Sequence, residues 1–245
     1  MKKFLGYIFT PIHYLSFSLF LVIFHPIQWL AFKLGGYKAH KFSVDVLNFF
    51  LTSTLYLIGT RVIFTNRQTL PGNRPIIFVS NHQSMYEIPP LIWFLRKYHA
   101  KFISKIELTK GIPSISFNLK YGGGANIDRK DSKQAVGEIL KLGIRIKENN
   151  WSAVIFPEGT RSRNGEPKTF AVGGIATLLK KAPNALIVPI AITGSWKIVR
   201  YGKYPLSFGE IMKLTVLKPI EPEDLLMEDL VLKAENAVRE FMIVN

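Results

Sequence analysis

His82 and Glu87 are the residues of this chain whose types and spacing best suit acid–base chemistry. They lie in residues 81–87 (NHQSMYE), just after the apolar run 76–79. An imidazole oriented by a carboxylate is the minimum arrangement for a general base. Five residues of regular helix turn the chain by about 500°, which would separate the two side chains. The pair therefore requires a loop or turn, and His82 taken alone is more often structural than catalytic.

A second polar segment, residues 156–163 (FPEGTRSR), follows the apolar run 153–156. Its glycine permits a close approach of the backbone to a ligand. Arg161 and Arg163 supply guanidinium donors of the kind that bind phosphate oxygens. A surface turn with solvated charges would explain the segment equally well. Polar clusters directly after buried strands nevertheless lie where α/β proteins usually bind ligands.

The elements that must position these segments follow from hydrophobic pattern. Short apolar runs predict strands at residues 62–64, 76–79, 102–103, 153–156, 185–192 and 214–217. Helices are expected over residues 88–98, over 132–147, and in the tail from Glu221. For the second of these, Asp131 is a candidate N-cap and the expected apolar face is Val136, Ile139, Leu140 and Ile144. The expected apolar face of the tail helix is Leu230, Val231, Ala234, Val238 and Phe241. We expect an α/β domain over residues 61–245, with a mostly parallel central sheet flanked by helices.

Residues 1–60 differ in composition from the rest. No Asp, Glu, Lys or Arg occurs between Lys3 and Lys33, and a second apolar segment, 42–58, follows Gly35-Gly36. A cleaved signal peptide is disfavoured because no small-residue cleavage site follows the apolar core. A spanning helix, a hairpin inserted in one leaflet and a buried core helix remain as alternatives. The glycine turn and flanking lysines favour a two-helix hairpin that anchors the domain to a membrane.

The formal net charge of +15 implies anionic partners. Residues 1–75 carry eight Lys/Arg and one acid, which suits lipid headgroups. Nucleic acid is disfavoured because no zinc-finger, RNA-binding or helix-turn-helix signature is present. The chain has no cysteine, which excludes thiol nucleophiles and Cys-ligated zinc. The spacing of its His, Asp and Glu residues suggests no metal site, and the histidines other than His82 are assigned structural or interfacial roles.

Taken together, the two polar segments resemble the glycerolipid acyltransferase family, specifically 1-acylglycerol-3-phosphate acyltransferases. That family carries Asn-His-x-Ser-x-x-Asp and, later, Phe-Pro-Glu-Gly-Thr-Arg-Ser. Residues 124–129 (GANIDR) and 188–194 (VPIAITG) are similar to two further family blocks, and Lys105-x-Glu107-Leu108 to another. The match covers roughly residues 60–200, and several blocks in order are far more specific than any one. One position departs from the pattern, because Glu87 stands where the family has Asp.

The resemblance implies roles for individual residues. His82 would take the proton of the acceptor hydroxyl, and Glu87 would orient its imidazole. Glu158, Gly159, Thr160 and Arg161 would form the acceptor site, with Arg161 the first choice for the phosphate and Lys105 and Arg129 the second. The acceptor hydroxyl is itself the nucleophile, and no Gly-x-Ser-x-Gly elbow supports an acyl-serine on Ser84. No cofactor or metal is expected; the co-substrate is acyl-CoA or acyl carrier protein.

The implied reaction acylates the sn-2 hydroxyl of lysophosphatidic acid and gives phosphatidic acid. The expected partners are a phospholipid membrane, a lysophospholipid acceptor and the acyl carrier, with the site at the cytoplasmic face of a membrane such as the bacterial inner membrane. Residues 196–204 (WKIVRYGKY) are expected either to contact headgroups or carrier phosphates or to form a solvated strand end, and the first is preferred. Phe117, Leu119 and Tyr121 are expected to line an acyl-chain groove. The alternatives are a different lysophospholipid, glycerol-3-phosphate or an aminolipid as acceptor, or a membrane-binding homologue with weak or no catalysis.

Overall fold

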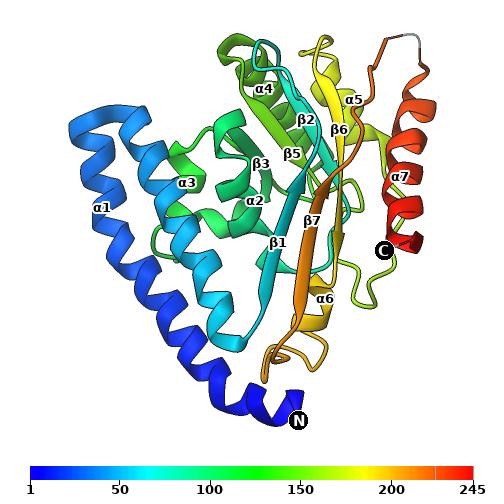
Figure 1. Ribbon diagram of the computed structural model, residues 1–245. Helices are drawn as coiled ribbons and strands as arrows, with labels where there is room; N and C mark the ends of the chain where they lie inside the picture. Colours follow the sequence, from blue (N-terminus) through cyan, green and yellow to red (C-terminus); the bar gives the residue numbers. More distant parts are fainter. Residues whose placement is uncertain (224, 245) are drawn as a thin grey trace.

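The computed structural model describes residues 1–223 and 225–244 and has three layers, with a central sheet between two sets of helices (Figure 1). The helices are α1 (Lys2–Ser53), α2 (Ile88–Phe94), α3 (Ile115–Tyr121), α4 (Ser132–Asn149), α5 (Val172–Leu179), α6 (Ser195–Ile198) and α7 (Met227–Val244). One face of the sheet packs against α1 and α2, and the other against α4, α5 and α7. The expected α/β architecture is confirmed.

The sheet has seven strands in the order β1-β7-β6-β2-β5-β3-β4. Their bounds are β1 Arg61–Asn66, β2 Ile76–Ser80, β3 Ala100–Lys105, β4 Ala125–Ile127, β5 Ser152–Ile155, β6 Leu186–Thr193 and β7 Ile211–Val216. Within the described residues, β6 and β7 form the one antiparallel pair, and the other pairs are parallel. All six predicted strands occur. The prediction missed β4, because a three-residue strand that pairs only with β3 is too short to leave a hydrophobic pattern.

The central strand β2 delivers the first polar segment to the edge of the sheet. All five of its residues are buried, since helices cover both faces and β5 and β6 pair on either side. Both neighbours run parallel to β2. The segments that follow β2, β5 and β6 therefore leave the same edge of the sheet, where α/β folds place ligands.

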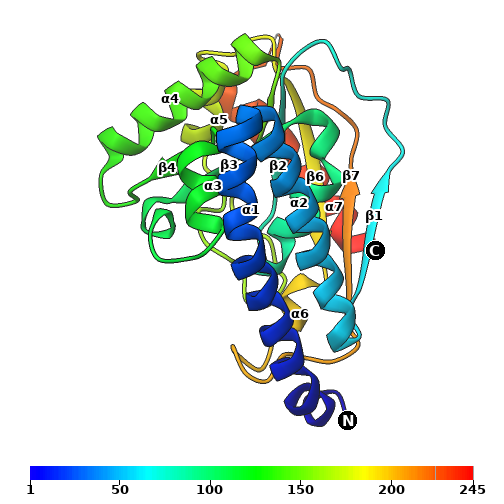
Figure 2. The ribbon, with the colours of Figure 1, turned by 90° about the vertical axis from the view of Figure 1, so that its left-hand side faces the viewer.

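The N-terminal segment folds back on itself as two helical limbs. Helix α1 is broken at Gly36, whose φ of 63° and ψ of −156° are outside the helical region. A positive φ is readily adopted by glycine, and the chain reverses there, so that the limbs lie side by side (Figure 1, Figure 2). The predicted helix pair with a glycine turn is confirmed.

The outer surface of this helix pair is apolar. Large hydrophobic side chains of the first limb are exposed, among them Phe4, Ile8, Leu15, Leu19, Val22, Leu30 and Leu34. The helical stretch is long and apolar enough to cross a membrane, and only 22% of its most apolar window is buried in the protein. An apolar surface that runs along the first limb and is not covered by the rest of the protein indicates association with a membrane.

Helix α4 begins as predicted but buries a different face. The Asp131 carboxylate accepts a hydrogen bond from the backbone N–H of Gln134 at 2.9 Å, which confirms the N-cap. The predicted apolar face is partly wrong, because Val136 and Ile144 are 47% and 39% exposed. The buried stripe is Ile139, Leu142, Gly143 and Ile146. Gly143 permits this register: a Cβ there would lie 2.9 Å from Lys181 and 3.0 Å from Leu178 of the helix packed against it.

Two further helices end or begin away from their predicted bounds. The helix expected over residues 88–98 stops at Phe94 and continues as a separate 3-10 turn, Arg96–Tyr98. The tail helix α7 starts at Met227 rather than near Glu221. Its predicted apolar side is confirmed, since Leu230, Val231, Ala234 and Val238 are buried and Phe241 packs against the core.

Candidate active site

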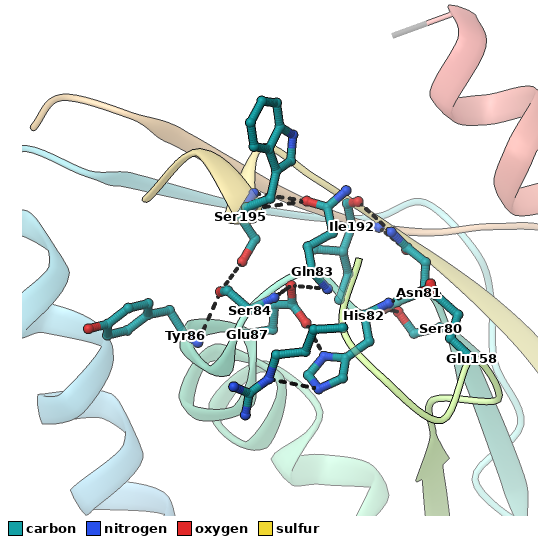
Figure 3. A network of polar contacts seen from close by, with 12 residues as sticks. Ser80, Asn81, His82, Gln83, Ser84, Tyr86, Glu87, Glu158, Ile192 and Ser195 are labelled. Carbon is teal, nitrogen blue, oxygen red and sulfur yellow. Dashed lines mark hydrogen bonds and ion pairs between the residues drawn. The ribbon is translucent and has the colours of Figure 1, made fainter. Parts of the chain in front are cut away.

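The side chain of Asn81 joins the loop after β2 to the end of strand β6. Its amide nitrogen donates to the carbonyl of Ile192, and its amide oxygen accepts from the N–H of Ile192, both at 2.8 Å (Figure 3). Because this buried amide both donates to and accepts from the backbone of one residue, it holds the ends of the two strands in fixed register. The position of His82, the next residue, is therefore set by the sheet.

His82 and Glu87 are in direct contact. The imidazole Nδ1 lies 2.7 Å from Glu87 Oε2, and the Glu87 side chain is fully buried (Figure 3). The other carboxylate oxygen accepts from the N–H groups of Gln83 and Ser84, at 2.8 and 2.7 Å. This closes a capping box on the 3-10 turn Met85–Glu87, with Ser84 as the N-cap. The predicted turn thus bridges the five-residue spacing.

The buried carboxylate determines which imidazole nitrogen is free. An ionised carboxylate only accepts hydrogen bonds, so Nδ1 of His82 carries the proton and donates it to Glu87. In the neutral ring, Nε2 is then unprotonated and can act as a base. The ring is also stacked on Phe156, with centroids 4.2 Å apart and planes at 20°. The imidazole is therefore fixed by one hydrogen bond and one aromatic contact.

The segment after β5 wraps around His82. Glu158 Oε1 accepts from the backbone N–H of His82 at 2.9 Å, and Ser162 N–H donates to the His82 carbonyl at 2.8 Å. Arg161 lies between these two residues in the sequence, and its Nε is 3.4 Å from His82 Nε2. The structure thus brings the two predicted segments together, with a guanidinium next to the free imidazole nitrogen.

More than half of the chain, residues 61–193, matches the family model described as Acyltransferase. The chain belongs to the acyltransferase family. The chloroplastic 1-acyl-sn-glycerol-3-phosphate acyltransferase BAT2 of Brassica napus is 32% identical to it over 179 residues, which cover 71% of this chain and 49% of that protein. The 1-acyl-sn-glycerol-3-phosphate acyltransferase of Borreliella burgdorferi is 29% identical, covering 59% of this chain and 57% of that protein. The chain spans about half the length of these two relatives.

The fold of this acyltransferase also has a counterpart among solved structures. The crystal structure of PlsC from Thermotoga maritima, a 1-acyl-sn-glycerophosphate acyltransferase, superimposes with a TM-score of 0.81. The similarity covers 98% of this chain and 96% of that chain at 23% sequence identity. It therefore includes the N-terminal helix pair as well as the sheet.

Two further predicted residues lie at the same edge of the sheet as His82 but farther from it. Lys105 ends β3 and is exposed, and Arg129 is exposed just beyond β4. In the strand order, β3 is the second and β4 the third strand from β2. With about 4.8 Å between neighbouring strands, their ends stand about 10 and 14 Å from the end of β2. The structure records no contact of either side chain with His82, Glu87 or Arg161.

Glu158 is turned toward the protein rather than toward solvent. Burial raises the pKa of its carboxyl group, and the hydrogen bond from His82 N–H opposes that shift. The backbone N–H of Lys168 also opposes the shift, and the second carboxylate oxygen, Oε2, is buried. Gly159 and Thr160 are exposed beside it, and a Cβ at Gly159 would meet nothing within 4 Å. Their predicted contact with the acceptor stays a prediction.

Gln83 is a structural residue of the site that the sequence did not reveal. It is 2% exposed; its amide nitrogen donates to the Gly165 carbonyl at 3.1 Å, and its oxygen accepts from Ser195 N–H at 3.1 Å. It therefore links the loops after β5 and β6. Ser84 contacts the hydroxyl of Ser195 and accepts from Tyr86 N–H, so its oxygen is used in capping. A lone Gln or Ser in a loop gives no such signal beforehand.

Within the described residues, no group of three or more His, Asp or Glu side chains is arranged to hold a metal ion. The titratable groups that the site does bring together are one imidazole, two carboxylates and one guanidinium. This set can hold an anion and move one proton, which is the chemistry of base-assisted acyl transfer.

Proposed function

We propose that this acyltransferase transfers a fatty acyl group from acyl-CoA or acyl carrier protein to the sn-2 hydroxyl of lysophosphatidic acid, giving phosphatidic acid. The observation that carries the proposal is the contact of His82 with Glu87 on one side and with Arg161 on the other. The names of the relatives agree with this acceptor. A phosphate held by Arg161 would bring the rest of the lysophospholipid close to Nε2 of His82.

In the proposed reaction, His82 Nε2 removes the proton of the acceptor hydroxyl as its oxygen attacks the thioester carbonyl. Glu87 stabilises the imidazolium that forms and keeps the ring in the required tautomer. The tetrahedral intermediate then collapses: the C–S bond breaks, and the leaving thiolate receives the proton from the imidazolium. One ester replaces one thioester, and no covalent acyl-enzyme is formed.

Arg161 is proposed to move when the acceptor binds. Its 3.4 Å contact with His82 Nε2 is long for a hydrogen bond and therefore weak. A phosphate forms stronger, charge-assisted bonds with a guanidinium. Binding of the acceptor would draw the guanidinium from Nε2 and leave that nitrogen free for the hydroxyl. Gly159 and Thr160 would line the same site, and Lys105 and Arg129 would add positive charge at its far side.

Glu87 stands where the family has Asp, and its contacts support a catalytic enzyme rather than a non-catalytic homologue. Glu87 reaches the imidazole at 2.7 Å and is also the third residue of a capping box. The longer side chain thus has a backbone geometry that accommodates it. This favours the enzyme over the alternative of a membrane-binding protein without turnover.

The helix pair is proposed to lie in one leaflet, with the catalytic edge at the cytoplasmic face, as in a bacterial inner membrane. The apolar surface of the first limb supports this placement, as does the reversal of the chain at Gly36, which returns the second limb to the domain. A lipid acceptor would reach the site from the bilayer and a soluble acyl carrier from the cytoplasm. A label on Met1 reacting only from the far side of the membrane would contradict this topology.

The deciding experiment uses the purified full chain in mixed micelles with lysophosphatidic acid and a long-chain acyl-CoA or acyl carrier protein, and measures phosphatidic acid. We expect product with at least one carrier and none with His82→Ala. Glycerol-3-phosphate, lysophosphatidylcholine and an aminolipid are compared as acceptors in the same assay. A higher kcat/KM for one of these would replace the acceptor, and no product with any of them would contradict the enzyme assignment.

A further inference from the structure

A cavity lies away from His82, between helix α1 and helix α3. Its volume is about 330 Å³, and it is lined by His25, Lys110, Phe117, Lys120 and Tyr121, with Thr109, Gly111 and Ser116 completing the wall. Figure 2 shows α3 beside α1. Phe117 and Tyr121 were expected to line an acyl-chain groove, whereas Leu119 is absent from the wall. None of the lining residues belongs to the site around His82.

The cavity is built on a loop that is tied to the membrane helix. Ser114 is buried and has a φ of 60°, unusual for a residue other than glycine. Its N–H donates to His25 Nδ1 at 3.1 Å, and its hydroxyl donates to the Leu21 carbonyl at 2.6 Å. Both partners belong to the first limb of α1. These bonds hold the loop in a strained conformation, so the cavity is preformed.

The hydrogen bond from Ser114 also sets the tautomer of His25. Since Nδ1 accepts that bond, the neutral ring carries its proton on Nε2. His25 therefore presents an N–H donor, with its other nitrogen already used. The Phe117 ring stands edge-on to it, at 6.1 Å between centroids and 89° between planes.

The two lysines of the cavity lack acidic partners. Lys110 and Lys120 are exposed, and the structure records no ion pair for either within the described residues. With the His25 donor they form a rim that suits an anion with several oxygens. The aromatic rings of Phe117 and Tyr121 give the same cavity an apolar side.

The cavity adjoins the exposed apolar surface of α1. Val22 and Trp29 precede and follow His25 by three and four residues and so share its helix face. They are 57% and 49% exposed. In the membrane placement proposed above, the cavity therefore adjoins the lipid-facing surface of α1.

We propose that this cavity binds the phosphate of an anionic membrane phospholipid, as a site separate from the catalytic one. Lys110 and Lys120 contact the phosphate, His25 Nε2–H donates to a phosphate or ester oxygen, and Phe117 and Tyr121 pack against the glycerol and first acyl carbons. The proposal rests on the membrane placement given above. The lipid bound in this cavity holds the helix pair at the membrane surface, and the acyl-transfer reaction does not consume it.

The test measures binding of dihexanoyl phosphatidylglycerol, below its micelle concentration, to the full chain in a neutral detergent by calorimetry. The variant Lys110→Gln/Lys120→Gln is compared with Lys130→Gln/Lys133→Gln, which removes two other exposed lysines. We expect saturable binding that weakens at least tenfold in the first variant and less than twofold in the second. Equal binding by both variants, or no saturable binding by the wild type, would overturn the site.

Two further arms identify the ligand. Inorganic phosphate should displace the lipid only at concentrations at least a hundredfold higher, because it lacks the glycerol and acyl carbons; displacement at equal concentration would overturn the lipid assignment.

The binding assay contains no acyl donor, so its failure is distinguishable from failure of acyl transfer. In neutral micelles, turnover by the Lys110/Lys120 variant should match the wild type. A turnover loss with binding intact would place the lysines in the acceptor site and contradict the proposal.

Discussion

The Glu87 carboxylate serves His82 with one oxygen and the backbone with the other. Oε2 is 2.7 Å from the imidazole Nδ1, and Oε1 accepts the N–H groups of Gln83 and Ser84. The residue that orients the imidazole is thus itself held by the turn that brings it there. Its negative charge and its length have separate consequences, and substitutions can separate them.

Glu87→Gln keeps the length of the side chain and removes its charge. We expect kcat to fall by about 10³- to 10⁴-fold, because the neutral amide neither enforces the tautomer nor stabilises the imidazolium. Glu87→Asp keeps the charge but shortens the reach, and should lose only about tenfold. Steady-state kinetics on lysophosphatidic acid checks both, with circular dichroism confirming the fold. Equal activity of the Gln variant and the wild type would remove Glu87 from the mechanism.

Arg161→Ala should act on the phosphate of the acceptor. We expect kcat/KM for lysophosphatidic acid to fall by about 10- to 100-fold, the loss of one charge-assisted contact. A monoacylglycerol, which lacks the phosphate, should be acylated equally by variant and wild type. Arg163→Ala is the matched control, since this exposed neighbour has no contact with His82 in the structure. The same loss on both acceptors would show that Arg161 does not recognise phosphate.

Two exposed leucines of the first limb test the membrane surface. Leu15 and Leu19 are 72% and 52% exposed, so Leu15→Glu/Leu19→Glu should leave the fold intact. Charges at these positions oppose insertion by about 2–3 kcal/mol each at full depth and less near the surface. We therefore expect the vesicle-bound fraction in a flotation assay to fall sharply. The control is Leu232→Glu/Ile243→Glu on α7, on the opposite face of the sheet, and an equal loss there would contradict the assignment of the membrane face.

Lys101 gives folding stability a dependence on pH. Burial, and secondly the nearby charge of Lys41, lower the pKa of Lys101 to about 7 from 10.5. Between these values the unfolded chain holds a proton that the folded chain lacks, so the unfolding free energy rises with pH. From pH 7 to 9.5 we expect the wild type to gain about 1–3 kcal/mol relative to Lys101→Met. Denaturant unfolding at both pH values measures this.

The exposed Lys147 provides the control for that measurement. Lys147→Met should follow the wild type at both pH values, because the Lys147 amine is exposed to solvent in the folded chain as it is in the unfolded chain. If the difference between the wild type and Lys101→Met stayed constant with pH, the buried amine would be charged throughout the range.

The local sequence determined the elements whose signals are short in range. Apolar runs predicted six strands, Gly35-Gly36 predicted a turn between two N-terminal helices, and Asp131 predicted the start of α4. Each of these signals depends on neighbours a few residues away. Residue types and spacing also indicated that His82 and Glu87 form a pair, provided that a turn intervened. The resemblance to a family then supplied the expected acceptor and the rank of Arg161.

Only the tertiary structure decided how these residues meet. The strand order places β5 and β6 on either side of β2, and this alone brings Phe156, Glu158 and Arg161 to His82 and lets Gln83 join the neighbouring loops. The same holds for the buried face of α4, which follows the helix packed against it, and for the cavity between α1 and α3. Such contacts join residues far apart in the chain, and no local pattern encodes them because their geometry depends on how the whole sheet and its helices pack.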